Sequence, residues 1–190
     1  ASRRAYDAGE LSADIAAEQE KLRWADAVVL QFPLWWLGPP AILKGWLDRV
    51  LVHGFGFGVT DPATGRVRRY GDGELAGKRG LVVTTIGARE SPFGPRGIHG
   101  DLDDVLFPLH HGVFWYTGMA ALPPLAIHGA DRADEGAAAR AVARLRRRLA
   151  GLACDEPLPY RSEHGGDYDE DPVLRPELGR GRSGLAVHYR

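Results

Sequence analysis

Apolar residues in this chain gather in short runs that polar and glycine-rich stretches separate. The runs AVVLQF (27–32) and GLVVTT (80–85) are short and rich in β-branched residues, which is typical of strands that are buried on both faces. A third run covers 120–128, but Pro123 and Pro124 interrupt it. Because proline cannot donate to a strand ladder, we expect this third strand to lie at a sheet edge or to be broken.

Helical periodicity appears between and around these runs. Ile42, Trp46 and Val50 recur at i, i+4 and i+8 and form one apolar stripe. The predicted helices cover 11–25, 40–51, 103–116 and 133–152, and the first ten residues are expected to be irregular. Strands that alternate with helices predict an α/β fold with a parallel sheet and right-handed crossovers.

The segment Pro33–Gly38 follows the first buried strand directly. Open α/β sheets bind their ligands beyond the carboxyl ends of such strands. The segment carries Trp35 and Trp36 beside Leu34 and Leu37, so it suits a flat aromatic ligand better than a sugar or a metal. Packing of both indoles against neighbouring helices is an equally good explanation of this composition.

Three further segments carry candidate chemistry. Thr84 and Thr85 end the second strand, where hydroxyl and backbone N–H groups can hydrogen-bond a heterocycle, although a plain exit from the strand explains them too. GFGFG (54–58) is either a glycine-rich turn anchored by its phenylalanines or a mobile aromatic wall. A lone histidine such as His99, just before a helix, is usually a capping or surface residue. His110 and His111 point about 100° apart on a helix, so we predict no metal site there.

Composition narrows the class of protein. The chain has 190 residues, 44% of them hydrophobic, which suits one ordinary domain. A net charge of −1 argues against a general nucleic-acid binder, and no apolar run approaches the roughly 20 residues that span a bilayer. Cys154 is the only cysteine, which fits a reducing compartment such as the cytoplasm.

From Asp155 onward the composition shifts to proline, glycine and charge. We therefore divide the chain into a domain at 1–154 and an extension at 155–190. The extension has too few apolar groups to form a core of its own, so it either stays mobile or wraps a partner subunit.

Four segments together resemble the NAD(P)H:quinone oxidoreductases. They are QFPLWWLGPPAILKGWLDRV (31–50), LVVTTIG (81–87), GIHGDLDDVLFP (97–108) and SGLAVHYR (183–190), and they occur in the family's order. The resemblance implies a flavodoxin-like parallel sheet with helices on both faces, binding FAD rather than FMN, in a homodimer whose active sites lie at the subunit interface. It identifies the three strands as the third, fourth and fifth of that fold.

The resemblance also implies that the first two strands of this fold, and the helix between them, are not in this sequence. The loop after the first strand normally holds the phosphates of the flavin. Without that strand, the strand at 27–32 becomes an exposed edge, which is an aggregation hazard unless another segment covers it. We expect the sequence to be part of a longer enzyme, or this edge to be covered.

The resemblance assigns roles to individual residues. Flavin contacts fall on Pro33, Leu34, Trp35, Trp36, Leu37, Thr84, Thr85, Ile86, Gly87 and Phe93. His99 is the catalytic residue, balancing charge beside the flavin. The substrate site comprises Trp36, Phe57, Val59, His99 and Tyr116, with Phe57 and Tyr116 reaching the neighbouring subunit's flavin. The family commonly has tyrosines at positions 57 and 59, and a tyrosine paired with the histidine where this chain has Phe93, so these phenol donors are absent.

The implied activity is two-electron reduction. NAD(P)H delivers a hydride to the flavin and leaves, and a quinone or similar flat acceptor then takes the same place, which requires ping-pong kinetics. Two alternatives stay open: a cytoplasmic regulatory subunit of a potassium efflux system, and a fragment that cannot bind flavin.

Overall fold

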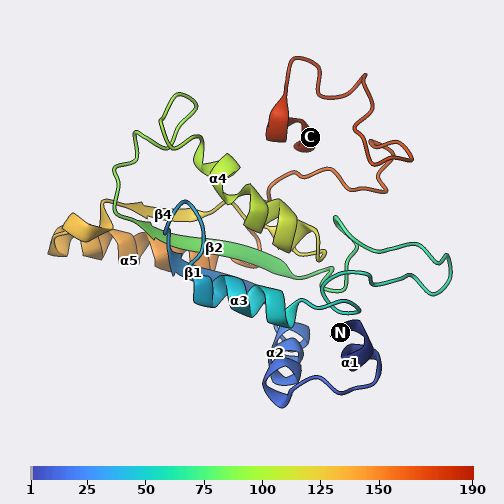
Figure 1. Ribbon diagram of the computed structural model, residues 1–190. Helices are drawn as coiled ribbons and strands as arrows, with labels where there is room; N and C mark the ends of the chain where they lie inside the picture. Colours follow the sequence, from blue (N-terminus) through green and yellow to red (C-terminus); the bar gives the residue numbers. More distant parts are fainter. Residues whose placement is uncertain (1) are drawn as a thin grey trace.

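The computed structural model describes residues 2–190, and a parallel sheet lies at its centre (Figure 1). Its strands are β1 (Ala27–Pro33), β2 (Arg79–Ile86), β3 (Ala120–Ala121) and β4 (Leu125–His128). The third predicted strand is indeed broken at its two prolines, and both pieces pair with β2. The predicted parallel α/β architecture is confirmed.

The register of the sheet brings three strand ends to one edge. β1 pairs with β2 from Ala27 opposite Arg79 to Pro33 opposite Thr85. β4 pairs with β2 as far as His128 opposite Ile86. In the described part of the chain, β1 pairs with β2 alone, so the prediction that this strand forms a sheet edge is confirmed.

Helices cover both faces of the sheet, as predicted. On one face, α3 (Ala41–Val50) and α4 (Leu102–Leu109) share a core with Val82. On the other face, α5 (Glu135–Ala150) packs against Leu81 and Val83. α2 (Ala13–Trp24) lies against α3, where the Gln19 side chain donates to the Val50 carbonyl at 2.9 Å.

The predicted helix 103–116 is in fact two segments. α4 ends at Leu109, and the wider π-helical segment η1 (His110–Trp115) continues it. Pro108 explains the change, because a proline removes one helical hydrogen bond and its ring presses on the preceding turn. His110 and His111 are both buried there, and burial lowers the pKa of each to about 4.

Two elements were missed from the sequence. The first residues are not irregular, because Ser2–Asp7 form helix α1, and Tyr6 packs against the main core. In the glycine- and arginine-rich stretch, Thr60 and Val67 pair as a short antiparallel hairpin, whose turn is closed by N–H groups donating to Asp61. Two short 3-10 segments, η2 (Ala130–Arg132) and η3 (Gly184–His188), complete the structure.

The extension packs against its own domain. It lies above and to the right of α4 in Figure 1, and Tyr160 is buried in the main core. The Trp115 indole donates to the Arg161 carbonyl at 3.0 Å, and the Tyr160 and Tyr189 hydroxyls lie 2.9 Å apart. This packing was not predicted from the sequence.

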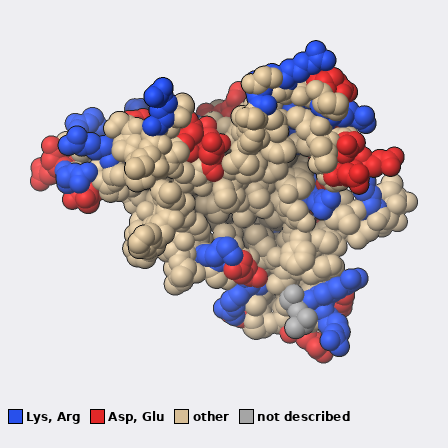
Figure 2. Space-filling model, turned by 45° about the horizontal axis from the view of Figure 1, so that its top comes forward, with Lys and Arg blue, Asp and Glu red and all other residues tan. Residues whose placement is uncertain are grey.

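On the face seen in Figure 2, charged side chains gather mainly at the margins around a broad uncharged area.

Candidate functional site

The segment after β1 forms a tight turn. Trp35 and Gly38 exchange two backbone hydrogen bonds, at 3.0 and 2.9 Å. The two central residues, Trp36 and Leu37, have φ angles of 52° and 59°. A left-handed conformation costs a non-glycine residue about 1–2 kcal/mol, and such strain is concentrated at functional sites.

This turn presents aromatic surface to solvent. Trp36 is fully exposed, at 102% of its reference area, and Trp35 is 61% exposed. The explanation in which both indoles pack against neighbouring helices is therefore wrong. The backbone N–H groups of Trp36 and Leu37 donate to no backbone carbonyl within residues 2–190, so the turn offers a ligand both flat apolar surface and hydrogen-bond donors.

The end of β2 lies directly beside this turn. The Leu34 N–H donates to the Thr85 carbonyl at 2.9 Å. Thr84 is completely buried, and its hydroxyl has no hydrogen-bond partner among the described residues. Thr85 is half-buried, Ile86 is buried and Gly87 is exposed. The strand end thus offers a ligand mainly the backbone around Gly87 rather than the Thr84 side chain.

Replacing Thr84 with valine is expected to stabilise the protein without any ligand. The change keeps the shape and removes a buried hydroxyl without a partner, a group that costs about 1–3 kcal/mol. We expect the free energy of unfolding in urea to rise by about 1 kcal/mol. A fall of the same size would mean that the hydroxyl has a partner, such as a bound water.

The loop between β2 and α4 contributes His99 and Phe93. The Phe93 ring is buried with Ile86, and Leu34 packs against the same cluster. The ring centroids of Phe93 and His99 lie 4.8 Å apart. The His99 N–H donates to the Pro92 carbonyl at 3.1 Å, which fixes the position of the histidine backbone.

His128 is a member of this cluster that sequence reasoning missed. Its ring centroid lies 5.5 Å from that of Phe93, and burial lowers its pKa. Its position as the last residue of β4 was the available signal, because β4 ends at the same sheet edge. The carboxyl edge thus gathers the predicted residues of the Trp-bearing turn, Ile86, Phe93 and His99 in one region.

The other predicted substrate residues lie elsewhere. Phe55 anchors the glycine-rich turn in the core, whereas Phe57 is exposed and Val59 is half-buried. Phe57 and Tyr116 line a groove of about 480 Å³ between α3 and the α4–η1 segment, and Leu37 lines it as well. Leu37 precedes α3 and Phe57 follows it, so the groove runs along this helix. The structure therefore divides the predicted site into two sets at opposite ends of α3.

Comparison with known proteins decides the family. The model of the flavodoxin-like fold family Flavodoxin_2 matches residues 1–149. The ribosyldihydronicotinamide dehydrogenase-like protein traD of Penicillium crustosum is 40% identical over 100% of this chain and 71% of its own length. The chain belongs to the flavodoxin-like NAD(P)H:quinone oxidoreductase family.

Further members of this family agree. NAD(P)H dehydrogenase [quinone] 1 of Rattus norvegicus is 36% identical over 82% of this chain. The matched region is 54% of that relative's length, so the chain spans about half of it. A crystal structure from Klebsiella pneumoniae, provisionally named a quinone reductase, matches with a TM-score of 0.95 and 48% identity over 100% of this chain and 74% of its own.

A more distant neighbour bears on the cofactor. General stress protein 14 of Treponema denticola, solved with FMN, matches at TM-score 0.56 and 26% identity, over 78% of this chain and 77% of its own.

Within residues 2–190, the helices are too short or too polar to cross a lipid bilayer.

Proposed function

We propose that this protein is a flavin-dependent reductase that passes a hydride from NAD(P)H to quinones or similar flat acceptors. The observation that carries the proposal is the strained turn at Trp36 and Leu37, which exposes two indoles beside the end of β2. A fold gains nothing from placing bulky residues in a left-handed turn that projects into water. The strain is explained if the turn binds a planar ring.

The exposed residues fit a flavin ring. Trp35, Trp36 and Leu37 offer apolar surface, and the N–H groups of Trp36 and Leu37 are free to donate to ring oxygens and nitrogens. A bound flavin would supply a two-electron carrier that accepts and donates hydride. We favour FAD on the family resemblance, and FMN is the alternative to be tested. An exposed thiol at Cys154 suits a reducing compartment such as the cytoplasm.

His99 is our candidate for the residue that balances charge. Overall, NAD(P)H loses a hydride to become NAD(P)⁺, and the quinone gains that hydride and one proton to become a hydroquinone. The half-buried His99 imidazole, backed by Phe93, can hydrogen-bond the acceptor oxygen where negative charge develops. Phe93 has no hydroxyl, so His99 acts without a phenol partner.

A homodimer would complete the site. The groove along α3 is lined mostly by apolar residues and carries Leu37 at one end and Phe57 with Tyr116 at the other. In a two-fold interface the same surface meets itself in opposite directions. Two grooves packed in this way would place Phe57 and Tyr116 of one subunit near the Trp-bearing turn of the other. The extension at 155–190 would add to this contact.

Replacing Gly112 with arginine tests the dimer. Gly112 is an exposed residue lining the groove, and no atom lies within 4 Å of the position that its Cβ would take. A buried, unpaired guanidinium costs about 3–5 kcal/mol, so we expect the dimer dissociation constant to rise about 100-fold or more in analytical ultracentrifugation. Gly136→Arg, at the start of α5, is the matched control and should leave the association state unchanged. An unchanged dimer in G112R would place the interface elsewhere.

The decisive test of the activity uses the purified protein with FAD or with FMN. After removal of unbound flavin, we expect retained flavin fluorescence and menadione reduction by NADH or NADPH, with parallel double-reciprocal lines that report a ping-pong mechanism. A protein with native circular dichroism that neither retains a flavin nor reduces menadione would contradict the proposal. Retention of FMN but not FAD would overturn only the choice of cofactor.

A further inference from the structure

A second cavity, of about 370 Å³, lies under the C-terminal extension. Its walls come from three separate segments. Arg69 and Tyr70 follow the hairpin, Phe107 and His111 come from the α4–η1 segment, and the extension closes the cavity from Arg161 to His188. None of the residues assigned above to the flavin or the quinone lines it, so its chemistry has to be read from its own side chains.

One wall of this cavity is built from flat rings. The Phe107 and His111 rings stack with their centroids 4.5 Å apart and their planes 16° apart. Tyr70 continues the wall, with its centroid 4.8 Å from that of His111 and an interplanar angle of 31°. Because Phe107 and Tyr70 cover the His111 ring, an aromatic ligand can stack on the outer face of Phe107 or of Tyr70.

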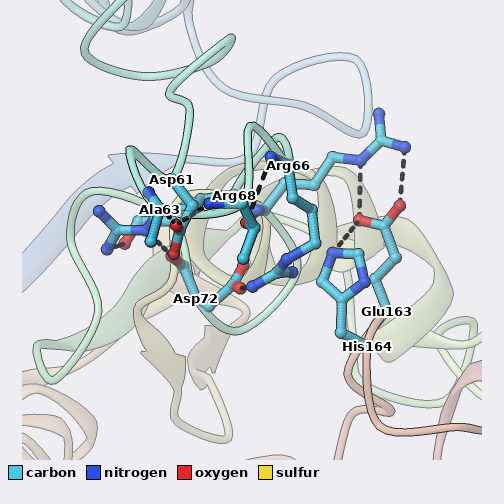
Figure 3. Close-up of polar contacts among 10 residues, drawn as sticks. Asp61, Ala63, Arg66, Arg68, Asp72, Glu163 and His164 are labelled. Carbon is cyan, nitrogen blue, oxygen red and sulfur yellow. Dashed lines mark hydrogen bonds and ion pairs between the residues drawn. The ribbon is translucent and has the colours of Figure 1, made fainter.

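The polar groups around this wall include two arginines, each paired with a carboxylate, and one of these carboxylates, Glu163, also lines the cavity. Arg69 donates through Nε and Nη2 to both carboxylate oxygens of Glu163, at 2.8 and 2.7 Å, as the paired dashed lines in Figure 3 show. Arg161 uses Nη1 for Asp167, at 2.8 Å, and Nε for the Val187 carbonyl, at 3.1 Å. Nη2 of Arg161 has no bond to the residues described. Arg69 has a further partner, because its pKa is raised first by Glu163 and then also by a hydrogen bond with Tyr116.

The histidines and the tyrosine add to this set. His111 is only 9% exposed, and its ring nitrogens bond to no other group in residues 2–190. Burial and the nearby His188 lower its pKa to about 4, so the ring is neutral at pH 7 and has one N–H to donate. The Tyr168 hydroxyl lies 2.9 Å from Nδ1 of His188. This hydrogen bond does not involve the second ring nitrogen of His188, Nε2.

We propose that this cavity binds a small planar aromatic carboxylate of one or two rings. The stacked wall takes the ring. The free Nη2 of Arg161 and the His111 N–H take the carboxylate, since charge-assisted bonds to arginine are the strong ones. The volume is at the lower end of the range for small-molecule pockets, about 300–1,000 Å³, which limits the ligand to this size.

The test is a calorimetric titration of the flavin-treated protein with 2-naphthoate. We expect one site per chain, and a dissociation constant about tenfold or more weaker for the matched neutral compound 2-naphthamide, which lacks the charge. His111→Phe keeps the stacking and removes the ring nitrogens, so it should weaken 2-naphthoate binding about fivefold or more. Glu163→Gln removes the carboxylate that occupies Arg69 and should strengthen binding.

Controls separate this site from the catalytic one. Arg180→Gln, at an exposed position of the extension, should leave the affinity unchanged. Binding should persist in the presence of saturating menadione and in protein that retains no flavin, so failure of the proposed reductase activity would leave this proposal standing. Three results would overturn it: no heat of binding up to about 1 mM 2-naphthoate, equal affinity for the amide, or displacement by menadione.

Discussion

Replacing Trp36 with glycine is expected to reduce flavin retention and menadione reduction about tenfold or more without destabilising the fold. The Trp36 side chain is fully exposed, so no packing is lost. Relief of the left-handed conformation gains about 1–2 kcal/mol, and the added flexibility of glycine costs about 0.5–1 kcal/mol. The free energy of unfolding should therefore stay the same or rise by about 1 kcal/mol.

The measurements are flavin titration, steady-state kinetics and urea unfolding of the same preparation. Trp24→Ala is the matched control, because Trp24 is also a highly exposed tryptophan but lies at the end of α2. It should leave both flavin binding and activity unchanged. If Trp36→Gly lowered stability and kept activity, the turn would stabilise the fold, and the proposal that it binds a planar ring would be contradicted.

Replacing Gly80 with alanine is expected to lower the free energy of unfolding by about 3 kcal/mol, because over-packing a core costs about 1–3 kcal/mol and sometimes more. Gly80 lies in the central strand β2, and a methyl group there would overlap the Phe114 ring, which is completely buried on η1. The β2 backbone cannot move away from the Phe114 ring easily, since β2 pairs with strands on both sides.

Chemical unfolding followed by far-ultraviolet circular dichroism measures this effect. Gly45→Ala is the control. Gly45 lies inside α3, and no atom lies within 4 Å of the position of its added Cβ. Alanine favours a helix over glycine by about 1 kcal/mol, so this variant should be slightly more stable. A tolerated G80A would mean that η1 does not press on β2 as closely as the structure has it.

The contrast between these two glycines shows where sequence reasoning stops. Both occur in apolar segments that were correctly predicted, one in a strand and one in a helix. Which of them another element touches depends on the position of η1, and the π-helical widening after Pro108 decides that position. No local pattern reports such a contact, because Gly80 and Phe114 are far apart in the sequence.

The candidate site divides in the same way. The sequence alone pointed to the segment after β1, because two tryptophans following a buried strand are visible without coordinates. It left open whether those indoles face the core or the solvent, and the handedness of the turn at Trp36 and Leu37 decides this. The sequence also made Thr84 and Thr85 equal candidates, but only the Thr84 hydroxyl is sealed in the interior.

The sequence by itself determined the parallel α/β architecture and the break at Pro123 and Pro124, because period, β-branching and proline act within a few residues. The exposed edge at β1 followed from the family resemblance. Only the tertiary structure decided how the extension packs on α4, which donor of Arg161 remains free, and which residues share a cavity. These features depend on contacts between distant segments, and such contacts exist only once the chain has folded.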